Sequence, residues 1–217
     1  MSYVAIVGGG PKDLIPDLHQ YKDKVSCWIG SDRGVLHIIE QGVTPDVAIG
    51  DFDSVSAVEK ALIKKNSRIY QEFPAEKDET DLELAVIKAI EQKADKLLLF
   101  GVTGGRIDHS MAAIQLLYRL LQQSIKGIIV DKGNWMELVQ AGEYELTNES
   151  SYPHISFIPF SKEVTQLSLE GFFYPLNNTT VTWGSTLCVS NKLIREKGTF
   201  SFNEGILIVI KSRDVLI

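Results

Sequence analysis

Short apolar runs alternate with helical patterns through the first 132 residues. The apolar runs have the length of buried strands, and between them apolar residues recur every three or four positions, as in amphipathic helices. The predicted strands span residues 3–7, 25–29, 47–49, 68–73 and 96–100. Strands that alternate with helices imply a mostly parallel, doubly wound sheet with helices on both faces.

The pattern changes after the alternating region. From Asn134 onward the chain consists of short stretches of alternating apolar and polar residues, separated by Gly, Asn, Pro and Ser, and no helical pattern remains. This is typical of an antiparallel β-sandwich or a partly closed barrel. The sequence therefore predicts an α/β domain at residues 1–132 and an all-β domain at residues 133–217.

The predicted helices carry specific expectations. Val58, Leu62 and Ile63 are expected to share the buried face of the helix that follows the third strand. Asp32 stands before another helix, where an acid can act as the N-terminal cap.

Composition narrows the classes of function. The 217 residues are 44% hydrophobic and 23% charged, as in ordinary soluble proteins. The net charge of −6 argues against a nucleic-acid partner.

No apolar run spans a bilayer and no secretory leader is visible, so a cytoplasmic location without membrane contact is expected. Cys27 and Cys188 lie in apolar segments and are expected to be buried, unpaired thiols.

Two acids follow the third strand directly, in the stretch VAIGDFDS at residues 47–54. Gly50 permits a sharp turn, and Asp51 and Asp53 then stand where open α/β sheets place their ligands. Oxygen ligands suit Mg²⁺, which takes one or two carboxylates together with substrate phosphates. A Mg²⁺–nucleotide site is one interpretation; a simple turn is the other, because Asp and Ser are common turn residues.

Further polar clusters stand at two other junctions between a loop and a helix. Asp78, Thr80 and Asp81 crowd the start of a helix, where Asp78 with Asp81 resembles a capping box. The stretch GVTGGRIDHS, residues 101–110, joins a strand to a helix and carries Arg106, a residue type that binds phosphate oxygens. Together with a helix N-terminus, this glycine-rich turn is a plausible anion site.

Three stretches, PDVAIGDFDS, KDETDLELA and GVTGGRIDHS, resemble in that order the thiamin pyrophosphokinase family. SDRG at residues 31–34 is similar to the acidic, glycine-bearing turn of the family, although Arg33 stands where many members have a second glycine. HISFIPF, LEGFFYPL and TLCVSNKL resemble the C-terminal strands of the family, so that the resemblance covers nearly the whole chain.

The resemblance implies an activity and an assembly. Members transfer a diphosphate from ATP to the hydroxyl of thiamine, giving thiamine diphosphate and AMP, and require Mg²⁺. The resemblance also implies a homodimer in which the α/β domain of one subunit and the β domain of the other complete each site. The α/β domain would then bind ATP and Mg²⁺, and the β domain would bind thiamine and dimerise.

Site residues follow from the same resemblance. Metal ligands, direct or through water, would be Asp51, Asp53 and Asp81, and the catalytic groups would be Asp51, Asp53 and Arg106. The residues around ATP would be Asp32, Lys77, Asp78, Thr80, Asp81, Arg106, Asp108 and His109. Ser190 and Asn191 would meet the pyrimidine end of thiamine, with Trp183 as a stacking wall.

Two other functions fit parts of the sequence. An aspartyl-phosphate phosphohydrolase would use Asp51 as its nucleophile and release inorganic phosphate. A non-catalytic nucleotide-binding regulator would bind ATP without forming AMP and would use its β domain as a partner surface. Incubation with ATP, Mg²⁺ and thiamine separates the three functions by their products.

Overall fold

A parallel sheet forms the centre of the first of two structural units. The computed structural model describes residues 2–215 and divides into Met1–Lys132 and Gly133–Ile217. The strands of the first unit are β1 (Tyr3–Val7), β2 (Val25–Ser31), β3 (Val47–Gly50), β4 (Ile69–Glu72), β5 (Lys96–Phe100) and β6 (Lys126–Val130). Their order is β6-β5-β1-β2-β3-β4, and all neighbours run parallel. All carboxyl ends therefore meet at one edge, the usual ligand edge of such sheets.

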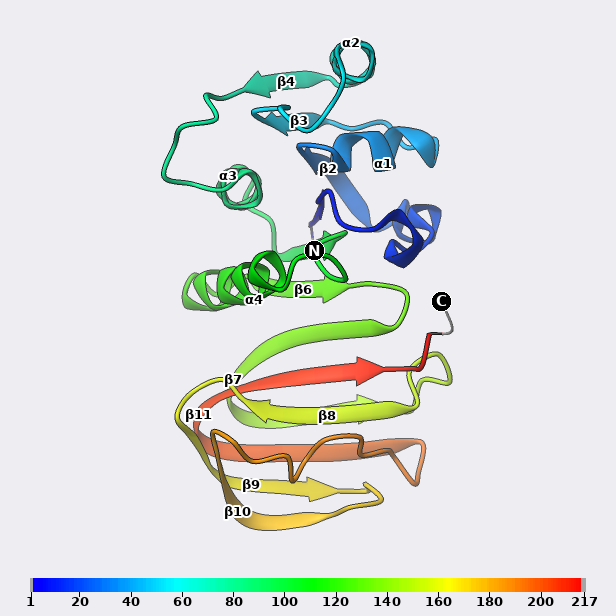
Figure 1. The fold of residues 1–217 in the computed structure, drawn as a ribbon. Coiled ribbons are helices and arrows are strands. Elements are labelled where there is room, and N and C mark those ends of the chain that lie inside the picture. The colour runs from blue at the N-terminus through cyan, green and yellow to red at the C-terminus, as the bar shows by residue number, and fades with distance from the viewer. Residues whose placement is uncertain (1, 216–217) are drawn as a thin grey trace. The chain divides into compact units, whose positions relative to one another are not determined.

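Helices cover both faces of this sheet (Figure 1). They are α1 (Gly34–Glu40), α2 (Ala57–Asn66), α3 (Asp81–Glu91) and α4 (Ile107–Gln122), with two 3₁₀ turns at Lys12–Leu14 and Leu18–Tyr21. Helices α1 and α2 pack against each other, as do α3 and α4, while α1 and α3 both pack on β1 and β2. The predicted doubly wound α/β architecture is confirmed. Within residues 2–215, no helix is both long and apolar enough to cross a membrane.

The apolar face expected on α2 is only partly buried. Ile63 is fully buried, whereas Val58 is 80% and Leu62 44% exposed. Because α2 packs against α1, a narrow apolar stripe is sufficient to hold it. The expectation of three buried residues on this face was therefore wrong for Val58 and Leu62.

Two helix caps also differ from expectation. The N-cap of α3 is Thr80, whose hydroxyl accepts a 3.1 Å hydrogen bond from the N–H of Glu83, so Asp78 forms no capping box. Helix α1 has no side-chain cap, and a carboxylate oxygen of Asp32 accepts a hydrogen bond from the hydroxyl of Ser54 instead. Capping therefore does not explain the acids at 32 and 78.

The second unit is an antiparallel β structure with no helix among its described residues, 133–215. Its strands are β7 (Asn134–Thr147), β8 (His154–Pro159), β9 (Glu163–Glu170), β10 (Leu176–Thr182) and β11 (Lys197–Ser212). Strands β7 and β11 each join two of the short stretches visible in the sequence. The order is β10-β9-β11-β7, with β8 on β11 as well. The predicted antiparallel sandwich or barrel-like class is confirmed.

Strand β11 links the two halves of this unit. Its first half pairs with β9 and its second half with β8, while β7 runs beside both halves. The register shifts between Phe202 and Ile206, where Gly205 has φ +101° and a Cβ would lie 2.4 Å from the carbonyl oxygen of Glu163. Only glycine fits this bend, which lets one strand serve two sheet segments. The side chains enclosed by the strands include Phe157, Leu167, Phe172, Phe200 and Leu207.

Both cysteines are free thiols. Cys188 is buried as expected, whereas Cys27 is only partly buried. Burial, followed by the charge of Asp46, raises the pKa of Cys27 to about 11. At neutral pH this thiol is therefore protonated and a poor nucleophile.

The residue between the two acids after β3 is an anchor. Phe52 is 2% exposed and stacks on Tyr70 with ring centroids 4.9 Å apart. Its backbone has φ 55°, a left-handed conformation that is rare for a bulky residue and concentrates at functional sites. Its neighbours in the core are Val35, Leu36, Ala48 and Ile63. The buried ring therefore fixes the turn that presents Asp51 and Asp53.

We expect Phe52→Ala to lower the free energy of unfolding by about 3 to 5 kcal/mol, because it empties a packed site. Urea denaturation followed by circular dichroism measures this loss. The matched control is Val58→Ala, at an apolar residue of the same unit that is 80% exposed, where the loss should stay below about 1 kcal/mol. Equal losses for the two variants would contradict the anchoring role of Phe52.

Candidate functional site

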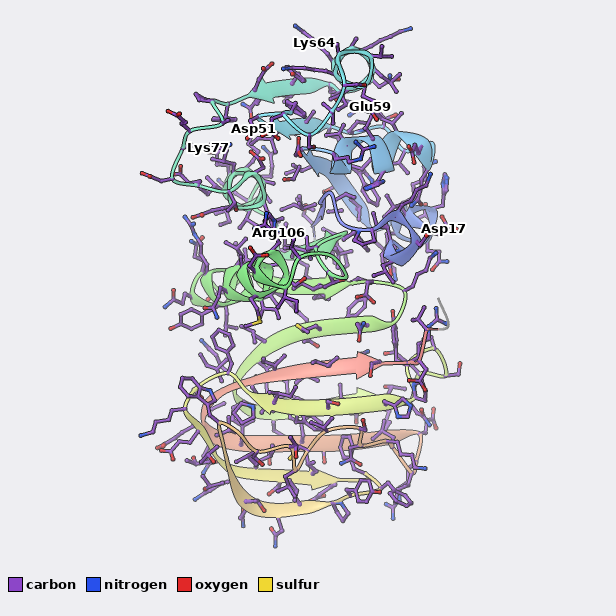
Figure 2. The ribbon with its side chains drawn as sticks, in the orientation of Figure 1. Asp17, Asp51, Glu59, Lys64, Lys77 and Arg106 are labelled. Carbon is purple, nitrogen blue, oxygen red and sulfur yellow. The ribbon has the colours of Figure 1, made fainter. Side chains whose placement is uncertain are left out.

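Charged side chains from three segments meet at the carboxyl edge of the first sheet. Asp32 follows β2, Asp51 follows β3, and Lys77 lies on the loop between β4 and α3. Asp81 is the first residue of α3. In Figure 2, Asp51 and Lys77 lie next to each other where this loop passes the end of the sheet. The parallel topology brings these segments together although 49 positions separate the outermost two in the sequence (81 − 32).

Backbone hydrogen bonds hold the two loops that carry Asp32 and Asp51. The N–H of Asp32 donates to the carbonyl of Ile49 at 2.9 Å, and the N–H of Phe73 donates to the carbonyl of Gly50 at 2.9 Å. The N–H of Asp53 donates to Asp51 Oδ1 at 3.1 Å. The turn is therefore well defined by hydrogen bonds before any ligand binds.

Lys77 bridges two of the acids. Its Nζ lies 3.3 Å from Asp51 Oδ2 and 2.9 Å from Asp81 Oδ1, and it donates to the carbonyl of Pro74 at 3.2 Å. The contact with Asp81 is a charge contact without hydrogen-bond alignment, since Oδ1 of Asp81 makes no aligned hydrogen bond within residues 2–215. The side chain of Lys77 is only 12% exposed.

The acids perturb one another. The charge of Asp51 is the largest cause that raises the pKa of Asp53, and the charge of Asp32 adds to it. Burial is the largest cause that raises the pKa of Asp81, with the charges of Asp51 and Asp32 adding to it. Like charges that raise each other's pKa indicate a strongly negative site, which favours a cation.

Between Lys77 and Asp51, attraction of opposite charges favours the charged form of each group. Burial alone would raise the pKa of Asp51, but the N–H of Asp53 and the ammonium of Lys77 outweigh it, so that the pKa is lowered. Burial disfavours the charged form of Lys77, yet its contacts with Asp81 and Asp51 prevail and raise its pKa. Asp51 and Lys77 are therefore an ionised pair at neutral pH.

The donor set of this site suits a hard divalent cation. As placed, no three His, Cys, Asp or Glu side chains of residues 2–215 form a metal-binding group, and Lys77 lies between Asp51 and Asp81. Mg²⁺, however, binds with one or two carboxylates, waters and substrate phosphates. The oxygens Asp32 Oδ1 and Asp81 Oδ1 are buried without a hydrogen bond in the described residues. The unpaired Asp32 Oδ1 and the mutual repulsion of the acids fit such a cation.

The other residues expected around ATP lie on exposed turns. Arg106, the N-cap residue of α4, forms a two-point pair with Asp108 in the first turn of the helix, at 3.1 Å from Nε and 2.5 Å from an Nη. His109 is exposed and donates its backbone N–H to Asp108. Asp78 is exposed on the β4–α3 loop, and Thr80 is the cap of α3. The loop that carries Arg106 follows β5 and leaves the sheet at the same edge as the acids.

Thr103 and Asp131 hold the glycine-rich turn and were not among the expected site residues. The Thr103 hydroxyl donates to Asp131 Oδ2 at 2.7 Å, and Asp131 is 5% exposed at the end of β6. The N–H of Gly10 donates to the carbonyl of Gly101 at 2.8 Å. A signal was present in the sequence, since an acid follows the apolar run of residues 126–130 as Asp51 follows residues 47–50.

In the second unit, Asn191 is used by its own fold. It is 1% exposed, its amide donates to the carbonyl of Tyr174 at 2.8 Å, and its oxygen accepts from the N–H groups of Tyr174 and Lys192. Asn191 also lines a cavity of about 270 Å³. The other lining residues are Leu169, Tyr174, Pro175, Leu176, Leu187 and Cys188. Asn191 is therefore suited to shaping an apolar pocket through Tyr174.

Ser190 and Trp183 lie outside the lining of that cavity. Ser190 is exposed, has φ 58°, and donates its N–H to Ser156 Oγ at 3.0 Å. Trp183 is 65% exposed, and its indole N–H donates to the carbonyl of Phe160 at 3.3 Å. This bond fixes the edge of the ring while its faces stay available for stacking.

Comparisons with known proteins agree across both units. The family model "Thiamin pyrophosphokinase, catalytic domain" matches residues 18–129. A second model, "Thiamin pyrophosphokinase, vitamin B1 binding domain", matches residues 143–207. Together the two matches cover most of both structural units.

Individual members of this family match the chain over almost its full length. A thiamine pyrophosphokinase of Bacillus subtilis is 47% identical over 99% of this chain and 100% of its own. The crystal structure of thiamine pyrophosphokinase from the same species has a TM-score of 0.91, covering 98% of this chain and 100% of the other. That from Geobacillus thermodenitrificans has a TM-score of 0.88 at 42% identity, covering 99% and 98%. The chain therefore belongs to the thiamin pyrophosphokinase family.

Proposed function

We propose that this protein transfers the diphosphate group of ATP to the hydroxyl of thiamine, forming thiamine diphosphate and AMP. The observation that carries the proposal is the cluster of Asp32, Asp51, Asp81 and Lys77 at the ligand edge of a sheet, in a chain of this family. Phosphoryl transfer depends mainly on positioning and on neutralising phosphate charge. A negative site with a buried ammonium and an exposed arginine nearby supplies groups for both tasks.

The α/β unit binds ATP and the cation in this proposal. Asp51 and Asp53, with Asp81 directly or through water, would hold Mg²⁺. When bound, Mg²⁺ would neutralise charge on the phosphate oxygens. Arg106 releases Asp108 or shares it and turns its guanidinium to the phosphates. Asp32, Asp78, Thr80, Asp108 and His109 line the surrounding loops as further ATP contacts.

The acids also offer a proton acceptor. The hydroxyl of thiamine must lose its proton as its oxygen attacks the β-phosphorus, the bond to the α-phosphate oxygen breaks, and AMP leaves. Either Asp51 or Asp53 would accept this proton. Both lie on one turn, fixed by the ring of Phe52 between them.

The β unit binds thiamine in this proposal. Its cavity is mainly apolar and Asn191 closes it with a single buried amide, a combination typical of small-molecule pockets. Trp183 presents free ring faces to a planar heterocycle, and Ser190 stands next to Asn191 in the chain. Aromatic stacking of this kind contributes about 0.5 to 1.5 kcal/mol.

We further propose a cytoplasmic homodimer in which each site combines the α/β unit of one subunit with the β unit of the other. In the single chain, the β unit exposes several large apolar side chains, which a second copy would cover. They are Phe173, Tyr174, Trp183, Leu187, Val189 and Ile194. Two free thiols are compatible with a reducing compartment.

The direct test incubates the purified protein with ATP, Mg²⁺ and thiamine and quantifies the nucleotide and phosphate products. We expect AMP and thiamine diphosphate in equal amounts and no AMP when thiamine is omitted. Release of inorganic phosphate with a phosphorylated Asp51 would instead identify a phosphohydrolase. Binding of ATP without any product would identify a nucleotide-binding regulator.

Asp53→Asn should reduce formation of AMP by about 10²-fold or more. The substitution removes one of the carboxylates proposed to bind the cation and to accept the proton of the thiamine hydroxyl. Initial rates at saturating ATP and thiamine measure the loss. Asp17→Asn is the matched control, since Asp17 only caps a 3₁₀ turn and asparagine caps equally well. A variant at position 53 with normal turnover would remove the role given to this acid.

Mixing two variants tests the shared site. Asp53→Asn damages the α/β unit and Trp183→Ala damages the β unit, so a mixed dimer contains one site built from two intact units. At low thiamine concentration an equimolar, re-equilibrated mixture should reach about a quarter of the wild-type rate, because half of the dimers are mixed and each has one intact site. A rate equal to the mean of the separate variants would show that each site lies within one chain.

A further inference from the structure

Lys77 occupies the centre of the proposed cation site. Its ammonium contacts two acids, Asp51 at 3.3 Å and Asp81 at 2.9 Å, and the carbonyl of Pro74 at 3.2 Å. The side chains of Asp51 and Asp81 are 14% and 20% exposed, and that of Lys77 is 12% exposed. A positive charge is thus already placed between the acids, largely out of water.

The neighbouring carboxylates make a positive charge necessary at this point. Asp32 follows β2 and Asp53 follows β3 at the same edge of the sheet, and their negative charges add to those of Asp51 and Asp81. Without Lys77, the turn after β3 and the start of α3 would repel each other. A divalent cation that bound Asp51 or Asp81 in the same place would be repelled by Lys77, because like charges at such short distances repel each other strongly.

The loop that carries Lys77 is held at both ends. Phe73 donates its N–H to the carbonyl of Gly50, and Thr80 caps α3. A lysine has a flexible four-carbon stem and a compact charge with three donors. The ammonium can therefore leave the acids by rotation of its own side chain while the loop ends remain in place.

We propose that Lys77 is a built-in counter-ion that fills the cation position while nucleotide is absent and moves to the ATP phosphates when Mg²⁺ and ATP enter together. This role rests on the proposed function, which supplies the cation and the nucleotide. It makes the site a poor binder of Mg²⁺ alone and a good binder of the Mg²⁺–ATP complex. Metal and nucleotide are thereby taken up as one unit.

The variant Lys77→Met tests this role, because its affinity should rise for Mg²⁺ alone and fall for Mg²⁺–ATP. Isothermal titration calorimetry with Mg²⁺ alone should show tighter binding to the variant, by about tenfold, which corresponds to about 1.4 kcal/mol. Titration with preformed Mg²⁺–ATP in the absence of thiamine should show weaker binding to the variant. Lys60→Met is the matched control, because Lys60 pairs with Glu72 on the surface at 2.6 Å, and it should leave both affinities unchanged.

A labelling experiment on the wild-type protein does not depend on a folded variant. Brief acetylation followed by mass spectrometry should show Lys77 protected in EDTA, labelled in excess Mg²⁺, and protected again with Mg²⁺–ATP. Lys12, whose side chain is 63% exposed, is the control and should be acetylated to the same extent under all three conditions.

The results separate this role from its alternatives. Weaker binding of both Mg²⁺ and Mg²⁺–ATP to Lys77→Met, or constant protection of Lys77 under all conditions, would overturn the counter-ion role and leave a structural one. Unchanged affinity for Mg²⁺ alone would overturn it as well. None of these measurements requires AMP formation, so a failure of the proposed function would appear separately, as absence of AMP with the wild-type protein.

Discussion

Mutual repulsion between carboxylates is the constraint on which the α/β unit depends. Three connections at one sheet edge each contribute acids, and parallel strands leave no other place for them. Such a site is stable only if its backbone is held firmly and its charge is countered. Phe52 provides the first condition, with its ring in the core and its backbone in a left-handed turn. Lys77 provides the second through its contacts with Asp51 and Asp81.

The first unit was largely predictable from sequence because its signals are local. Apolar runs and helical periodicity placed β1 to β5 and the helices, whereas β6 was not predicted, and the order of three motifs indicated the family. What failed was set by packing between elements. Val58 and Leu62 match a buried face, but α2 packs mainly against α1 and only Ile63 of this face is fully buried. Asp78 has the spacing of a capping residue, yet Thr80 lies closer to the helix and takes the N–H.

The second unit was predictable as a class and not in its strand limits. Glycine residues at 142 and 205 look like strand ends in sequence, whereas in the structure they lie inside two long strands. Asn191 shows the same difficulty for the site. A Ser-Asn pair suggests direct contact with a substrate, but the Asn191 side chain makes its three hydrogen bonds with the backbone of its own unit. Its part in the proposed pocket is therefore to hold Tyr174 in place, a role that only coordinates reveal.

Strand β11 has a consequence for how the chain acquires its structure. The first unit joins strands that follow one another closely, apart from the β1–β5 pair, so its sheet can form while later residues are still being synthesised. In the second unit, β7 and β8 both pair with β11, and β9 needs β11 as its second neighbour beside β10. These strands must wait, with unpaired edges, until residues 197–212 emerge from the ribosome. Pairings this distant in sequence are slow to form, so the second unit should be the stage at which nascent chains are most exposed to aggregation and most in need of chaperones.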